Sequence, residues 1–449
     1  MRKSLFIFAV ITCSFLQAQF TIQGTIDPDH DYSWILLYQM QNGDQTYVAN
    51  ADVVDGQFTF EVDENQPAGI YRAYYQIENS LYVEFIYNKE DVDFSFDPNH
   101  PVESISFSQS EENIVYHDYY DAIKLKQHQI DSIQVLYFKA TDKEEEAGLT
   151  KDYKKFLAEL KEEQATYEKN SSSLMANHFI RASAQYNADS PHKDPKDYLD
   201  AIKAHFFDAM SLSDSVLSHS TFINDRLNDY VFYLNQGDDH LSQNALQKSA
   251  IEKAVKWIGT STEVLSNFEE ELLDTYLLQE NVEMINFVID NFYKNLPASY
   301  QDEELLRRLT SSLKTAIGVT APDFSWKENG TDLSLHSLTG TDYYIVLFFS
   351  SNCPHCQMEI PEFYTFISGI ENIKVVAVGL EDEQESWEAM TNEYAEFINI
   401  LDLDKWSSQK VKDYGITAIP TYLVLDADKK ILAKPEDFDE LKSMFETKQ

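Results

Sequence analysis

The residues best suited to chemistry are two cysteines in the last quarter of the chain. Cys353 and Cys356 form a Cys-Pro-His-Cys sequence, in which Pro354 and His355 separate the two thiols. The chain has three cysteines, and the third, Cys13, lies near its start. Thiols spaced this closely cannot staple a large loop, but they can exchange a disulfide with a second molecule. The pair therefore predicts thiol–disulfide chemistry rather than scaffolding.

The residues around the cysteines predict a strand before them and a helix after them. Tyr343–Phe349 is an almost continuous apolar run, which is typical of a buried central strand. The helix would place Cys353 at its N-terminus, where free N–H groups and the helix dipole stabilise a thiolate. Cys356 would lie one turn further on and be more buried. We therefore expect Cys353 to be the nucleophile and Cys356 to be the resolving thiol that releases the substrate.

The two intervening residues are compatible with these roles. His355 can add positive charge beside the thiolate or donate a hydrogen bond to it. Pro354 lacks an N–H group, and this loss has no cost in the first turn of a helix. The chemistry needs no bound cofactor, because the redox-active disulfide Cys353–Cys356 carries the electrons itself.

A metal site is the alternative interpretation of a Cys-x-x-Cys pair. A structural zinc site needs four ligands, and the sequence has no second cysteine pair to complete one. Two other clusters, Asp27–Asp31 and Asp238–His240, combine carboxylates with a histidine. The first lacks the glycine and distal glutamate of a calcium loop, so we interpret it as a solvated turn. We interpret the second as a loop or a helix cap, and we expect no metal.

Several motifs in residues 318–449 resemble those of the TlpA/ResA-like thiol–disulfide oxidoreductases, which have a thioredoxin fold. Ala321–Phe324 resembles the opening motif of that family, and Leu333–Leu338 precedes the strand before the cysteines. Pro361 matches the proline that kinks the family's active-site helix, and Gly415–Thr421 resembles its cis-proline loop. The resemblance implies an α/β thioredoxin fold with a redox-active cysteine pair.

The resemblance also implies roles for single residues. Pro420 would be cis and face the cysteines, and Ile419 would offer backbone groups to a bound substrate strand. Asn352 replaces the tryptophan that the family usually has before the first cysteine, so this substrate-facing position differs here. Leu347 stands where thioredoxin has a buried aspartate, so proton transfer to the second cysteine needs another group. Glu359 matches an acidic residue near the family's active site and is the candidate; a solvated glutamate on the helix face is the alternative.

The start of the chain has the organisation of a secretory signal peptide over residues 1–18. Met1–Lys3 is basic, Leu5–Leu16 is largely apolar, and small residues precede a cleavage point before Gln19. We therefore expect an exported protein. Lipid anchoring through Cys13 is the less favoured alternative, because too little apolar sequence precedes that residue.

The remaining sequence predicts a multidomain protein. Residues 19–107 predict an antiparallel β-sandwich-like domain of short strands, with a hairpin turn at Asp55–Gly56. This part resembles an uncharacterised β domain found ahead of TlpA/ResA-like domains, which implies the periplasm or cell envelope of a Gram-negative bacterium. Residues 108–317 predict an all-α region whose first helix starts at Ser110, and residues 318–449 predict the thioredoxin fold.

The composition restricts the partners. With 35 Lys and Arg against 76 Asp and Glu, the formal net charge is −41. Such a surface repels phosphate backbones, which excludes nucleic acid as a partner and disfavours anionic membranes. The partners that we expect are envelope proteins carrying thiols or disulfides, together with a redox partner protein. The sequence does not determine the oligomeric state.

Three functions remain for the whole chain. The first is an exported thiol–disulfide oxidoreductase; the Pro-His dipeptide resembles that of the oxidant DsbA, whereas the domain resembles reductants, and we favour reduction. The second is an envelope binding or scaffold protein whose thioredoxin-like domain is redox-inactive or regulatory. The third is a peroxidase of the same superfamily, which would need its peroxidatic cysteine at a different place in the fold.

Overall fold

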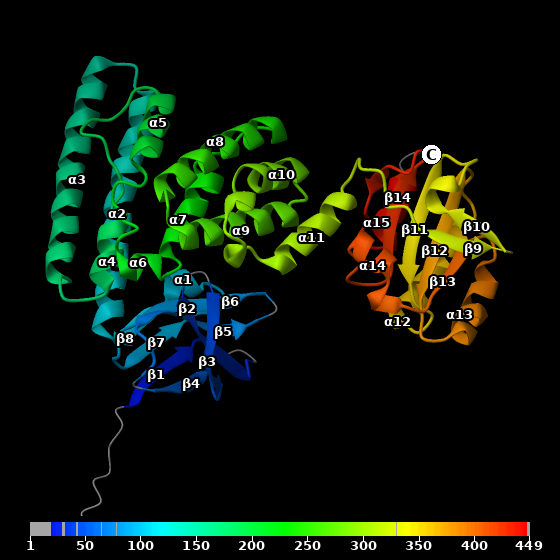
Figure 1. The fold of residues 1–449 in the computed structure, drawn as a ribbon. Coiled ribbons are helices and arrows are strands. Elements are labelled where there is room, and N and C mark those ends of the chain that lie inside the picture. The colour runs from blue at the N-terminus through cyan, green and yellow to red at the C-terminus, as the bar shows by residue number, and fades with distance from the viewer. Residues whose placement is uncertain are drawn as a thin grey trace, which may run out of the picture. The chain divides into compact units, whose positions relative to one another are not determined.

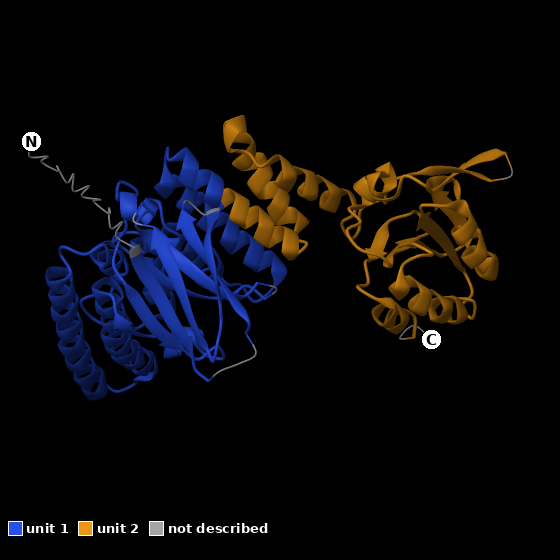
Figure 2. Cartoon of the chain, turned by 90° about the horizontal axis from the view of Figure 1, so that it is seen from below, with its two compact units in different colours: residues 1–268 blue, residues 269–449 orange. Residues whose placement is uncertain are grey.

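The structure, a computed structural model of the 449-residue chain, describes residues 19–446 except 29–31, 42, 43, 64, 78 and 329. The predicted signal peptide, Cys13 and residues 29–31 of the Asp27–Asp31 cluster lie outside these residues. The three predicted regions, first β, then helical, then α/β, are confirmed (Figure 1). The chain divides into two compact units, residues 1–268 and 269–449, with the boundary inside α9 (Thr262–Leu278) (Figure 2).

Unit 1 begins with a β sandwich. Its described strands form two sheets, with the orders β4-β1-β7-β8 and β3-β2-β5-β6. The bounds are β1 (Gln19–Ile26), β2 (Trp34–Gln41), β3 (Asp44–Asp52), β4 (Gln57–Asp63), β5 (Gly69–Gln76), β6 (Leu81–Tyr87), β7 (Val92–Phe96) and β8 (Ser106–Gln109). Buried side chains of both sheets, among them Ile22, Leu37 and Phe94, share one core. Among the described strands of this sandwich the pairing is antiparallel except between β1 and β7, which are parallel.

Of the hairpin predicted at Asp55–Gly56, the turn is present but the pairing of the two flanking strands is not. Both residues have positive φ, 52° and 73°, and Val54 and Gln57 form a bridge across them. The strands on either side do not pair with each other, because β3 pairs with β2 and β4 pairs with β1. The expected hairpin is therefore wrong. The turn passes the chain from one sheet of the sandwich to the other, so that β3 and β4 belong to different sheets.

The helices of unit 1 follow the sandwich. As predicted, α2 (Glu111–Lys139) begins after Ser110, whose hydroxyl accepts a hydrogen bond from the Asn113 N–H. α2 packs beside α3 (Lys143–Asn170) and buries apolar residues such as Ile130 and Leu157 between them (Figure 1). The shorter helices are α1 (Pro101–Ser104), α4 (Ala176–Ala182), α5 (Pro195–His205), α6 (Ser215–Ser218), α7 (Phe222–Asn228) and α8 (His240–Ile258).

Two buried side chains at the start of α2 attach the helices to the sandwich. The amide of Asn113 bonds both backbone groups of Ile86, accepting from its N–H at 2.8 Å and donating to its carbonyl at 2.7 Å. Glu112 accepts from the N–H groups of Met175 and Ala176 at 2.9 and 2.7 Å. Sandwich and helices therefore form one unit.

Unit 2 contains the predicted thioredoxin fold. Its described helices before the fold are α10 (Val282–Asn291) and α11 (Glu303–Lys314), and its sheet has the order β13-β12-β11-β14-β15. The bounds are β11 (Tyr343–Phe349), β12 (Ile373–Leu380), β13 (Ile398–Asp402), β14 (Thr421–Asp426) and β15 (Ile431–Ala433). The first three are mutually parallel, and β14 runs antiparallel to β11. A separate ribbon pairs β9 (Ser325–Glu328) with β10 (Thr331–Ser334).

Both faces of the central strand are buried, as the apolar run Tyr343–Phe349 predicts. Tyr344, Val346 and Phe348 enter one core together with α14 (Gln409–Tyr414). Ile345, Leu347 and Phe349 enter the other, together with α12 (Pro354–Ile367) and α15 (Phe438–Glu446). The remaining helix is α13 (Gln384–Thr391). Because β11 is held from both faces, its C-terminal end is a rigid support for the cysteines that follow.

Candidate active site

The cysteines occupy the positions expected at the start of α12. Cys353 is the N-cap residue of this helix, and Pro354 is its first residue. Cys353 is partly exposed, whereas Cys356 is fully buried in the core between α12 and the sheet. The exposed thiol therefore lies beside the free N–H groups of a helix end, where a thiolate is stabilised. Both thiols are free in the structure.

The proline loop lies against the first cysteine. The Ile419–Pro420 peptide bond is cis, and the Cys353 thiol points at the Ile419 carbonyl with an Sγ–O distance of 3.7 Å. Ile419 and Pro420 are both partly exposed, so their backbone borders the same surface as the thiol. The structure thus brings these three residues together, although they come from segments 66 residues apart.

Burial gives the second cysteine a different character from the first. It raises the pKa of the Cys356 thiol well above its ordinary value, and the nearby Cys353 and Glu359 add to this rise. A hydrogen bond from the backbone of Ser350 acts in the opposite direction but does not cancel it. Cys356 is thus protonated at neutral pH, and it must lose a proton before it can attack.

Glu359 is held at this buried end of the site by a tyrosine. The Tyr422 hydroxyl donates to the Glu359 carboxylate at 2.8 Å, and the Tyr422 side chain is fully buried. Burial, strengthened by the charge of Glu359, raises the pKa of Tyr422, so the phenol keeps its proton and remains a donor. Glu359 is partly buried and has a partner inside the domain, unlike a solvated glutamate on a helix face.

The other two predicted residues lie on the surface of the site. Asn352 is exposed, and its N–H donates to the Ser350 hydroxyl at 3.3 Å. His355 is exposed on the first turn of α12, and among the described contacts it bonds neither cysteine. The roles predicted for both residues stay predictions.

Sequence reasoning missed two residues of the site. Tyr422 lies two positions after Pro420 in a predicted strand, where its hydrophobic pattern suggested only a core residue. Glu381 directly follows β12, and its buried carboxylate accepts hydrogen bonds from Ser350 and Ser351 just before the cysteines. A polar residue at the carboxyl end of a parallel strand is the signal that could have identified Glu381, because such ends meet at one edge of the sheet.

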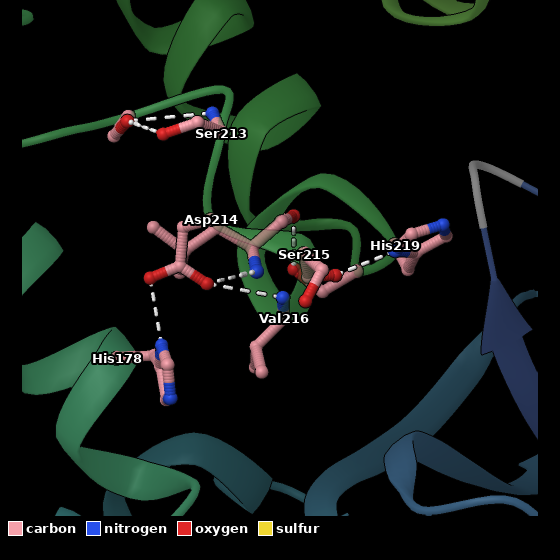
Figure 3. Close-up of polar contacts among 9 residues, drawn as sticks. His178, Ser213, Asp214, Ser215, Val216 and His219 are labelled. Carbon is pink, nitrogen blue, oxygen red and sulfur yellow. Dashed lines mark hydrogen bonds and ion pairs between the residues drawn. The ribbon is translucent and has the colours of Figure 1, made fainter.

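Outside the thioredoxin-like domain, two of the described carboxylates, Asp239 and Asp214, cap helices. Asp239 caps α8 by accepting from the Ser242 N–H, as one of the two interpretations of Asp238–His240 predicted. Figure 3 shows His178 bonded to Asp214 at 2.7 Å, while the other oxygen of Asp214 accepts from the Val216 N–H at the start of α6. In the described part of the chain, no group of three or more His, Cys, Asp or Glu side chains is arranged to hold a metal ion.

A family comparison assigns the domain that carries the cysteines. Residues 317–434 match the AhpC/TSA family. This region is an AhpC/TSA thioredoxin-like domain. Residues 20–116 match a domain of unknown function, DUF4369, so the predicted β domain ahead of the thioredoxin-like domain is also present. No curated protein matches the chain.

Solved structures resemble parts of the chain. A thioredoxin-like protein from Bacteroides caccae is 21% identical, with a TM-score of 0.41, over 59% of this chain and 98% of its own. The thioredoxin domain of a thiol-disulfide oxidoreductase from Bacteroides vulgatus is 23% identical, with a TM-score of 0.27, over 29% of this chain and 96% of its own. A thiol:disulfide interchange protein from Bacteroides sp. is 23% identical, with a TM-score of 0.27, over 30% of this chain and 90% of its own.

Proposed function

We propose that the protein is an exported thiol–disulfide oxidoreductase that acts on envelope proteins through Cys353 and Cys356. The Cys353 thiolate attacks a substrate disulfide, forms a mixed disulfide and releases one substrate thiolate. Cys356 loses its proton and attacks the Sγ atom of Cys353, which releases the second substrate thiolate. Two electrons pass to the substrate, and the Cys353–Cys356 disulfide forms. The reverse sequence oxidises a dithiol substrate.

The difference in exposure between the two thiols carries this proposal. Cys353 is partly exposed at a helix N-terminus, and its Sγ atom lies 3.7 Å from the Ile419 carbonyl. Cys356 is fully buried behind it. An exposed nucleophile and a protected resolving thiol are what a two-step exchange requires, because the buried thiol can reach only the neighbouring mixed disulfide.

The proton of Cys356 needs an acceptor during the second step. Glu359 is our candidate, because its negative charge acts on the buried thiol and its carboxylate is anchored by Tyr422 at 2.8 Å. Ile419 and Pro420 would bind a substrate strand through their backbone, and Asn352 would contact the substrate at the rim of the site. His355 would stabilise the Cys353 thiolate.

The location and direction of the reaction belong to the same proposal. The signal-like residues 1–18 support export, and the DUF4369 match over residues 20–116 supports the domain arrangement expected of an envelope protein. Among the described residues, no helix is both long and apolar enough to cross a membrane. We favour reduction of substrates, in which case a redox partner protein must return electrons to Cys353–Cys356. No bound cofactor or metal is needed.

Cysteine variants test the proposal directly. We expect Cys353→Ser to lower the rate of disulfide exchange with a protein substrate at least about 100-fold, because the attacking thiolate is lost. Cys356→Ser should instead accumulate a mixed disulfide between Cys353 and the substrate, visible on a non-reducing gel. The mature chain with both cysteines intact is the control, since residues 1–18, which include Cys13, are expected to be removed on export.

The same assay separates the other functions. Unchanged exchange in Cys353→Ser would refute the oxidoreductase. A cysteine pair that does not titrate in glutathione buffers would point to a scaffold. Consumption of hydrogen peroxide without exchange on proteins would point to a peroxidase. A reduction potential near about −270 mV would support reduction, and one near about −120 mV would support oxidation.

A further inference from the structure

Glu381 is a fully buried carboxylate next to the active-site loop. It follows β12, which lies beside β11 in the sheet (Figure 1). Its oxygens accept hydrogen bonds from the Ser351 N–H at 2.5 Å, the Ser351 hydroxyl at 2.9 Å and the Ser350 hydroxyl at 3.2 Å. These three donors provide hydrogen bonds to a carboxyl group that has no exposed surface.

The lysines near this position bind other carboxylates. Lys405 pairs with Asp382, and Lys410 pairs with Asp402 at 2.8 Å. Glu381 is therefore held by hydroxyl and N–H dipoles of the loop before the cysteines. Such an arrangement restrains both partners, because leaving any of these buried groups unpaired costs about 1–3 kcal/mol.

The serines that bind Glu381 also hold the cysteine loop. The Ser350 carbonyl accepts from the Cys353 N–H at 3.2 Å, and the Ser351 carbonyl accepts from the Gln357 side chain at 2.7 Å. The Ser350 hydroxyl, while donating to Glu381, accepts from the Asn352 N–H. Ser350 thus links Glu381 to Cys353, because its hydroxyl bonds the carboxylate and its carbonyl bonds the Cys353 N–H.

We propose that Glu381 is a positioning residue for the nucleophile, which fixes the Ser350–Asn352 turn and thereby the place of Cys353 against the Ile419 carbonyl. This inference rests on the proposed function. In thiol–disulfide exchange the attacking sulfur must approach along the axis of the disulfide, so small displacements of Cys353 slow the reaction. A misplacement of about 1 Å can cost about 100-fold in rate.

The variants distinguish an effect of the position of the Glu381 carboxylate from an effect of its charge. Glu381→Asp keeps the charge but draws the carboxylate back from both serines, and Ser351→Ala removes one donor and keeps the charge. Glu381→Gln removes the charge but keeps an acceptor oxygen for the Ser351 N–H. Glu383→Asp is the matched control, since Glu383 is exposed and lies two residues away.

The readout is the exchange rate of each reduced full-length variant with a small disulfide, together with the potential of its cysteine pair. We expect Glu381→Asp and Ser351→Ala to exchange about tenfold more slowly than the wild type. The variant with both changes should be no slower than the slower of the two single variants. The exchange rate of Glu381→Gln should lie within about threefold of the wild-type rate. Glu383→Asp should react at the wild-type rate. The potential should change in the two slow variants and not in the control.

Three results would overturn the inference: wild-type exchange in folded Glu381→Asp, slower exchange in Glu381→Gln than in Glu381→Asp, or additive effects in the double variant. If Glu381→Asp does not fold, Ser351→Ala decides alone. Any accessible thiol reacts with a small disulfide. Failure of the protein to act on protein substrates would therefore refute the proposed function without affecting this measurement.

Discussion

Tyr422 lies directly opposite Leu347 on the neighbouring strand β14. Leu347 is the position where thioredoxin has its buried aspartate, so the chain lacks that carboxylate on β11. The tyrosine on the partner strand instead anchors a carboxylate from α12, that of Glu359, at 2.8 Å. The carboxylate of Glu359 thus comes from a helix and is held by a tyrosine on a strand.

Removing the tyrosine hydroxyl tests whether this anchoring matters. We expect Tyr422→Phe to slow the attack of Cys356 on the mixed disulfide about tenfold, because Glu359 is no longer held beside the buried thiol. Alkylation of Cys353 should be unchanged. Tyr414→Phe is the control, since the Tyr414 hydroxyl donates to the Pro322 carbonyl at 2.6 Å and its ring packs in the core on the other face of the sheet. Equal rates in both variants would contradict a role for Tyr422.

At the scale of elements, α9 carries a buried acid with an unusual environment. Glu269 is only 2% exposed, and its Oε2 atom has no hydrogen-bond partner among the described residues. Burial, together with the charge of Glu270, raises the pKa of Glu269 from its ordinary range to about 8. The folded chain therefore prefers this side chain protonated.

This shift makes stability depend on pH in a defined direction. Below the unfolded pKa of about 4.3, this carboxyl is protonated in both the folded and the unfolded state, so its titration does not lower the free energy of unfolding. As pH rises from there to about 8, the unfolded state releases this proton first, so the free energy of unfolding falls.

We expect Glu269→Gln to reduce this fall and to be more stable than the wild type at about pH 8 by more than about 1 kcal/mol. Urea unfolding at several pH values would measure the difference. Glu263→Gln, an exposed change on the same helix, should leave the slope unchanged. A parallel pH dependence of Glu269→Gln and the wild type would refute the assignment.

At the scale of the whole molecule, the charge is the dominant property. With 35 basic and 76 acidic residues, the chain attracts cationic partners and repels anionic ones. Clients with basic surfaces should therefore reach Cys353 faster than acidic ones do, and this preference should weaken in salt.

Small disulfides of opposite charge test this property. We expect a dicationic disulfide such as cystamine to react with Cys353 about tenfold faster than a dianionic one such as dithiodiglycolate at low salt. The ratio should approach one between about 10 mM and about 300 mM salt, because the Debye length falls below the distances between surface charges. A neutral disulfide gives the baseline, which should not depend on salt. A ratio that salt does not change would show that local contacts, rather than net charge, set the preference.

The sequence by itself determined the local features of this protein. The apolar run Tyr343–Phe349, the helix start at Ser110 and the turn at Asp55–Gly56 all form as predicted, because strand burial, helix capping and turn geometry depend on neighbouring residues. The thioredoxin-like domain was predictable because its motifs resemble those of a known family. The partners of the strands at Asp55–Gly56 and the parallel pairing of β1 with β7 were not predicted, since pairing depends on distant segments.

The resemblance predicted that the Ile419–Pro420 loop faces the cysteines, whereas only the tertiary structure placed Tyr422 and Glu381 at the site. Cys353 and Ile419 are 66 residues apart, Glu359 and Tyr422 are 63 apart, and Glu381 lies 30 residues from Ser351. These contacts follow from the order and register of β12, β11 and β14, and a shift of one residue would turn Tyr422 to the other face of the sheet. Side-chain type and spacing cannot specify such a register, because it is set by the packing of the whole sheet against its helices.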